Sequence, residues 1–127
     1  MLTLGMTVLG VTDMRRAMIF WSMALNYDVI QGGDDSSWTE LGPGDEAEPL
    51  LALQLSEVPP QDHPRVHIDL DTSGAEEQEA EVKRLVSLGA TLVDWDSYPE
   101  DPDFVVLADP EGNIFCVVNT GHAPAGD

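Results

Sequence analysis

The sequence is short of basic residues, with 5 lysines and arginines against 24 aspartates and glutamates and a formal net charge of −19 at pH 7. A surface of this charge repels nucleic acid and anionic membranes, so we expect neither as a partner. It also disfavours a strongly anionic substrate unless a metal or Arg65 compensates. Two interpretations of the acidity stay open: it serves only solubility, or it favours neutral or cationic ligands.

Cysteine and long apolar runs are scarce as well. Cys116 is the only cysteine, so no disulfide can form within the chain, as is usual for proteins of the reducing cytosol. No stretch approaches the ~18 apolar residues that cross a bilayer, and the N-terminus has no cationic start followed by a long apolar segment. The sequence has no glycine-rich phosphate loop, no Ser–His–Asp arrangement and no cysteine–histidine zinc spacing. We therefore expect a cytoplasmic protein with no membrane partner.

The order of the expected elements repeats once along the chain. The length of 127 residues predicts one domain, residues 1–127. Within it we expect module one at about 3–57, module two at about 65–119 and a flexible tail at 120–127. Each module has the order strand–helix–strand–strand–strand. The expected strands are 4–11, 27–31, 36–41, 50–55, 65–71, 91–95, 103–108 and 113–118, and the expected helices are 14–25 and 74–88.

Alternation along the strands separates an apolar face from a mixed face. In the strand 65–71, Val66, Ile68 and Leu70 are expected opposite His67 and Asp69. The mixed faces of the other strands carry Met6, Gln54 and Cys116. A sheet that is apolar beneath its helices and mixed on the other side predicts a curved sheet around a cavity.

Four segments carry a resemblance to a known family: Val8–Leu25, Arg65–Asp71, Leu88–Thr91 and Leu107–Val118, the last with the turn Asp-Pro-Glu-Gly-Asn. The chain resembles the vicinal-oxygen-chelate superfamily (glyoxalase/bleomycin-resistance/dioxygenase), and within it the glyoxalase-like domain subgroup. The resemblance implies an α+β fold in which two βαβββ modules form a curved mixed sheet around a cavity. It also implies a homodimer, because many relatives pair their modules across a two-fold axis.

The resemblance also implies where a metal would bind. Metal-using members hold a divalent ion at four positions that correspond here to Met6, Gln54, His67 and Cys116. This set lacks both carboxylates and the second histidine expected for Mg, Mn or Fe(II), and Cys116 stands where a glutamate is usual. We therefore predict no cofactor. A divalent metal stays possible, with Gln54, His67 and Cys116 as its ligands.

We predict a small-molecule-binding protein whose ligand, neutral or cationic, contacts Met6, Trp38, Gln54, His67 and Cys116. Trp38 would stack on the ligand, since a flat ring supplies apolar area and cation–π attraction. The alternative is an enzyme of the same superfamily: a lyase, isomerase or dioxygenase that depends on a metal or on His67 as the catalytic general base. A module that only contacts other proteins is a third option.

Plainer roles are open for the same residues. His67 serves as a neutral pocket histidine bonded to Gln54 or Asp69, and Cys116 is an inert, half-buried thiol because no basic residue adjoins it. Trp21 belongs to the core. The other two histidines, His63 and His122, are expected to be solvated. Trp95, Tyr98 and Phe104 receive no role from the sequence.

Overall fold

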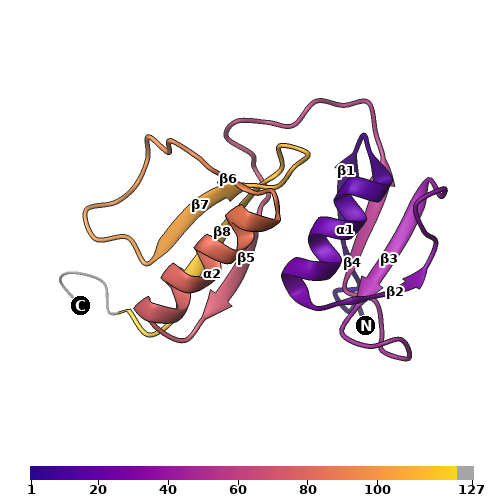
Figure 1. Ribbon diagram of the computed structural model, residues 1–127, viewed down its shortest axis with the longest axis horizontal. Coiled ribbons are helices and arrows are strands. Elements are labelled where there is room, and N and C mark those ends of the chain that lie inside the picture. Colours follow the sequence, from indigo (N-terminus) through magenta and orange to yellow (C-terminus); the bar gives the residue numbers. More distant parts are fainter. Residues whose placement is uncertain (123–127) are drawn as a thin grey trace. The chain divides into compact units, whose positions relative to one another are not determined.

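The computed structural model describes residues 1–122, and the chain divides into two compact units, Met1–Pro59 and Pro60–Asp127. Each unit has one four-stranded mixed sheet and one helix (Figure 1). The α+β class and the repeated βαβββ order are confirmed. The boundary between the units falls between Pro59 and Pro60, inside the proline-rich connector. Neither helix within residues 1–122 is long and apolar enough to cross a bilayer.

The first unit contains β1 (Thr7–Val11), α1 (Met14–Leu25), β2 (Asp28–Gln31), β3 (Trp38–Gly42) and β4 (Leu51–Leu55). The strand order is β1-β4-β3-β2. β1 and β4 are parallel, whereas the β4–β3 and β3–β2 pairs are antiparallel.

Helix α1 forms where its sequence supplies a cap and an apolar face. The Asp13 side chain accepts a hydrogen bond from the Arg16 backbone N–H at 3.1 Å, which caps the first turn. The helix ends at Asn26, whose φ of 55° is left-handed. The buried face follows helical spacing and comprises Met14, Ala17, Phe20, Trp21 and Ala24. Trp21 is fully buried, as predicted.

The second unit contains β5 (Ile68–Thr72), α2 (Ala75–Leu88), β6 (Thr91–Leu92), β7 (Phe104–Ala108) and β8 (Ile114–Asn119). Its strand order, β5-β8-β7-β6, matches that of the first unit. β5 and β8 are parallel, and the other pairs are antiparallel. Gly89, with a φ of 120° that favours glycine, ends α2.

Thr72 and Ser73, two residue types that often cap helices, precede α2, but neither is its N-cap. The N-cap residue is Gly74, which offers no side-chain bond. Ser73 instead binds Glu77 in the first turn, through its backbone N–H at 3.3 Å and its hydroxyl at 3.2 Å. The glutamate thus ties the residue before the cap to the first turn of α2 and does not replace a capping side chain.

Several strands are shorter than predicted because their ends have no partner strand. The first strand begins at Thr7 rather than at residue 4, since its parallel partner begins at Leu51, just after Pro49. The strand expected from residue 65 begins at Ile68, which pairs with Phe115. Val66 therefore lies outside the sheet and is 80% exposed, against its predicted place on the buried face.

The predicted tail starts with residues that are hydrogen-bonded. The Thr120 backbone N–H and hydroxyl both donate to the Thr72 carbonyl, at 2.9 and 2.8 Å. His122 was expected to be solvated, but its Nε2 lies 3.1 Å from Asp101 Oδ2 and its side chain is only 25% exposed. Residues 123–127, the rest of the predicted tail, lie outside the described residues.

Candidate functional site

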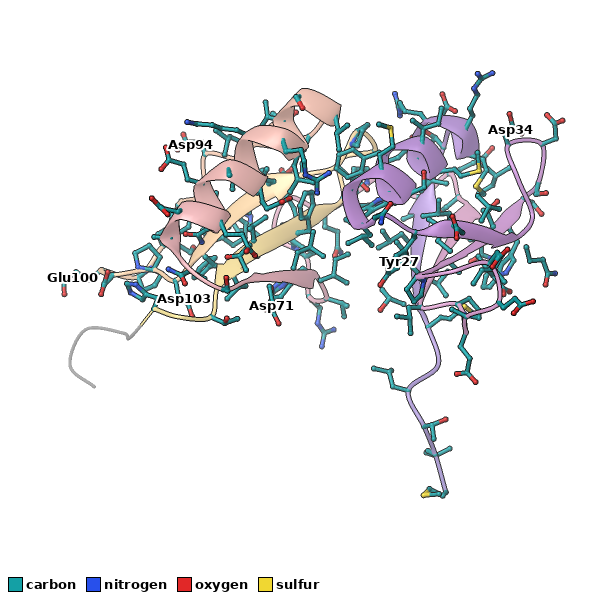
Figure 2. The ribbon with its side chains drawn as sticks, turned by 60° about the horizontal axis from the view of Figure 1, so that its bottom comes forward. Tyr27, Asp34, Asp71, Asp94, Glu100 and Asp103 are labelled. Atoms are coloured by element: carbon teal, nitrogen blue, oxygen red, sulfur yellow. The ribbon has the colours of Figure 1, made fainter. Side chains whose placement is uncertain are left out.

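The second unit contains a cavity of about 380 Å³ on the mixed side of its sheet. Strands β5, β7 and β8 form its floor, and the segments before β5 and between β6 and β7 form its rim. Figure 2 shows Asp71 and Asp103 on the side of this sheet away from α2. The cavity is lined by Pro64, His67, Asp69, Trp95, Asp103, Phe104, Val106, Ile114, Cys116 and Val118.

Strand register explains why these residues meet. Asp69 pairs with Cys116 across β5 and β8, and Cys116 pairs with Val106 across β8 and β7. Paired residues point to the same face of a sheet, so the three side chains form one row across the floor. Phe104 pairs with Val118 and extends the floor by a second row.

Three possible donor groups cluster at one end of the floor. His67 Nε2 lies 3.0 Å from Asp69 Oδ1, and the ligand atoms of His67, Asp69 and Cys116 all lie within 4.8 Å of one another. The histidine and aspartate side chains are 43% and 54% exposed, whereas Cys116 is 5% exposed. Gln54 and Asp69 were the two hydrogen-bond partners expected for His67, and Asp69 is the one in contact with it.

The Cys116 thiol keeps its proton at neutral pH. Burial first, and the nearby charge of Asp69 second, raise its pKa from the ordinary 9.0 to about 11. A protonated thiol is a weak nucleophile, so the geometry supports the interpretation of Cys116 as an unreactive wall of the cavity.

The donor set does not fit the hard divalent ion that the resemblance implies. Such ions prefer oxygen ligands, whereas this cluster offers one nitrogen, one carboxylate and one sulfur. The thiol would have to ionise first, which costs roughly 5 kcal/mol at pH 7 for a pKa of about 11. Only a thiophilic ion such as Zn²⁺ suits these atoms. The third donor is Asp69, whereas the sequence pointed to Gln54, which lies in the first unit.

The other predicted site residues lie in the first unit. Trp38 and Gln54 are direct partners across β3 and β4, so they share one face of that sheet. The Trp38 indole N–H donates to Glu40 Oε2 at 2.8 Å, which orients the half-buried ring. Met6 is half-buried and precedes β1. The structure thus brings His67 together with Cys116, and Trp38 together with Gln54. That both pairs line one common cavity stays a prediction.

Sequence reasoning missed four lining residues that matter chemically: Trp95, Phe104, Asp103 and Pro64. Phe104 had a usable signal, because strand alternation places it on the same face as Val106. The strand expected at 91–95 ends at Leu92 instead, so Trp95 lies in the segment between β6 and β7, where strand alternation says nothing about its place.

The comparisons with known proteins agree with this architecture. A family model described as a glyoxalase-like domain matches residues 6–118. No curated protein matches the chain significantly. Similar solved structures include a protein from Agrobacterium tumefaciens with 12% identity and a TM-score of 0.73, covering 94% of this chain and 98% of that one.

Two further structures are similar to this chain. A glyoxalase/bleomycin resistance protein/dioxygenase family enzyme from Burkholderia phytofirmans has 16% identity and a TM-score of 0.70, covering 93% of this chain and 98% of its own. A variant of a fosfomycin resistance protein from Listeria monocytogenes, complexed with Mn(II) and 1S,2S-dihydroxypropylphosphonic acid, has 16% identity and a TM-score of 0.71, covering 93% and 90%. At these identities the likeness establishes the fold.

Proposed function

Because the chain belongs to the glyoxalase-like domain family, we propose that it is a small-molecule-binding protein whose ligand is neutral or cationic and lies in the cavity of the second unit. In this proposal binding needs no divalent metal. The observation that carries it is the lining: two aromatic rings and two carboxylates face the cavity, and none of its lining residues in the described part of the chain is lysine or arginine.

The apolar part of the lining supplies the affinity. Trp95, Phe104 and the aliphatic side chains of β7 and β8 can cover a flat apolar ligand. Removing ~150 Å² of apolar ligand surface from water contributes about 4 kcal/mol before the entropic cost of binding. That is enough for a ligand held mainly by shape and apolar contact.

The charged part of the lining sets the preference for charge. Asp69 and Asp103 favour a positive group and oppose a negative one, and the aromatic faces add cation–π attraction. The overall net charge of −19 acts in the same direction at longer range. His67 and Cys116 are the two predicted ligand contacts within this lining, and Met6, Trp38 and Gln54 remain predicted contacts. We also propose that the protein is cytoplasmic and that it functions as a homodimer.

Two fluorescent probes that differ by one sulfonate test the proposal. N-phenyl-1-naphthylamine is neutral, and 8-anilinonaphthalene-1-sulfonate is its anionic analogue. We expect the neutral probe to bind at least tenfold more tightly, because the sulfonate meets the carboxylates of the lining. Equal affinity for the two probes, or no binding of the neutral one, contradicts the proposal.

A pair of truncations locates the bound probe. Phe104→Ala removes an aromatic wall of the cavity and should weaken binding of the neutral probe by about tenfold, the equivalent of ~1.4 kcal/mol. Val86→Ala is the matched control, since this exposed residue of α2 lies outside the cavity lining. If the two variants bind the neutral probe with equal affinity, the probe binds outside this cavity.

One observation favours an enzyme as the second candidate. The contact of His67 Nε2 with Asp69 stabilises the tautomer that carries its proton on Nε2, which directs the lone pair of Nδ1 to general-base work in a lyase or isomerase. Such an enzyme should exchange solvent deuterium into a carbonyl compound, and His67→Gln should abolish the exchange. A metal-dependent lyase or dioxygenase requires instead about one metal ion per purified chain by elemental analysis, and sensitivity to chelators.

A further inference from the structure

Two segments that lie far apart in the sequence meet beside the cavity of the second unit. The first precedes β5 and contains His63 and Pro64, and the second joins β6 to β7 and contains Trp95 and Asp96. Pro64 and Trp95 line the cavity, while His63 and Asp96 are their immediate neighbours in sequence. A contact between His63 and Asp96 therefore links the two segments that form the rim of the cavity.

His63 holds the second segment by two contacts. Its Nε2 lies 3.0 Å from Asp96 Oδ1, and its ring stands over the Trp95 ring with centroids 4.8 Å apart and planes inclined by 33°. The hydrogen bond from His63 is the first cause of the lowered pKa of Asp96, and a bond from Ser97 is the second. The carboxylate is therefore charged throughout the neutral range.

The backbone around Trp95 is anchored on both sides but not at the tryptophan itself. The Val93 N–H donates to the Val106 carbonyl at 3.2 Å, and the Val106 N–H donates to the Tyr98 hydroxyl at 2.7 Å. Trp95 lies between these anchors and outside the strands. The imidazole of His63 is the aromatic neighbour that packs against its ring.

We propose that His63 is a positioning residue that holds Trp95 as a wall of the cavity, and that its pairing with Asp96 makes ligand binding depend on pH. The inference rests on the proposed function, because it concerns the same cavity. A protonated imidazole binds the carboxylate more strongly and adds cation–π attraction to the indole, so the wall is held best on the acidic side of neutrality.

Other charged groups lie near His63, Trp95 and Asp96, and the effect of His63 has to be distinguished from theirs. Asp62 and Arg65 flank His63 in sequence, and Asp94 precedes Trp95. The two remaining histidines have partners of their own, since His67 contacts Asp69 and His122 contacts Asp101. A variant that removes only the His63 imidazole isolates its contribution.

The first test follows tryptophan emission between pH 5 and pH 8 without any ligand. Protonated imidazole quenches an indole against which it packs, so the wild-type protein should lose emission as the pH falls. His63→Asn retains a polar side chain but neither titrates nor stacks, and it should remove this transition. Trp95→Phe should remove it as well, because it takes away the indole that the imidazole quenches. The His63 side chain is 58% exposed, so we expect the variant to fold, and circular dichroism checks this.

The second test measures the affinity for N-phenyl-1-naphthylamine, which stays neutral over this range. At pH 6 the His63→Asn variant should bind it about two- to fivefold more weakly than wild type, the effect of one exposed charge-assisted contact. At pH 8 the difference should shrink. The comparison of the variant with wild type at each pH isolates the contribution of the His63 side chain.

The outcomes separate the two proposals. A wild-type protein that never binds the neutral probe overturns the proposed function, and the emission titration then still decides whether His63 holds Trp95. Wild-type binding that equals that of His63→Asn at pH 6 overturns the coupling alone. An emission transition that persists in His63→Asn overturns the positioning role.

Discussion

The reactivity of the single cysteine offers a sharp test of the cavity floor. Cys116 is 5% exposed, and its pKa is raised to about 11, first by burial and second by the charge of Asp69. A rise from the ordinary 9.0 lowers the thiolate fraction at pH 7.5 by about a hundredfold. Because only the thiolate attacks, iodoacetamide should modify the folded protein at least a hundredfold more slowly than the chain unfolded in guanidinium.

One pair of variants separates the two causes of the shift. Asp69→Asn removes the adjacent charge and should speed alkylation by about two- to threefold, because the charge is the lesser cause. Asp71→Asn is the control, since Asp71 pairs with Val118 across the sheet and not with Cys116. Mass spectrometry of the intact chain follows both reactions without interference from any other thiol.

The same shift has a consequence for stability. The thiol is more acidic in the unfolded chain than in the folded one, so its contribution is complete below pH 9 and is lost as the pH rises towards 11. Over that window wild type should lose roughly 3 kcal/mol more of its unfolding free energy than Cys116→Ala, measured by urea denaturation. Alkylation of the folded protein within tenfold of the unfolded rate, or parallel pH profiles of the two proteins, would refute the argument.

Three further predictions concern the fold that holds the site, each measured by urea denaturation. Phe115→Ala, at a fully buried position of β8, should lower the unfolding free energy by about 3–5 kcal/mol through the cavity it leaves; a loss below 1 kcal/mol would contradict this packing. Asp13→Ala should cost about 1 kcal/mol by removing the cap of α1, and Asp13→Asn, which keeps an acceptor, should cost less. Gly112→Ala should cost at least ~1–2 kcal/mol, because Gly112 has a φ of 86° and an added Cβ would lie 2.8 Å from the Pro60 ring, whereas Gly44→Ala, whose Cβ would lie 3.9 Å from that of Ala47 in ordinary contact, should have little effect.

Local patterns predicted the helices and most strands well. Asp13 and the apolar residues at helical spacing define α1, and Gly89 ends α2, because caps and amphipathic faces depend on residues close in sequence. Strand ends were predicted less well. β1 starts at Thr7, opposite the first residue of β4, and β5 starts at Ile68, opposite Phe115 of β8, so both starts depend on partners that lie dozens of residues away.

The candidate site was only partly predictable for the same reason. Alternation placed His67 and Cys116 on the mixed face, and the structure brings both to one cavity with Asp69. Trp95 received no role from the sequence and His63 was expected to be solvated, whereas the two rings pack against each other from segments far apart in the chain. Their packing depends on where the segments before β5 and after β6 run in space.

The sequence by itself determined the charge of the protein and its repeated order of elements. These properties follow from residue identity and short-range spacing. Only the tertiary structure decided that Asp69 joins His67 and Cys116, that burial holds the Cys116 thiol in its protonated form, and that Trp95 walls the cavity against His63. Register, burial and loop contacts arise from residues that meet across the fold, so no local pattern could reveal them.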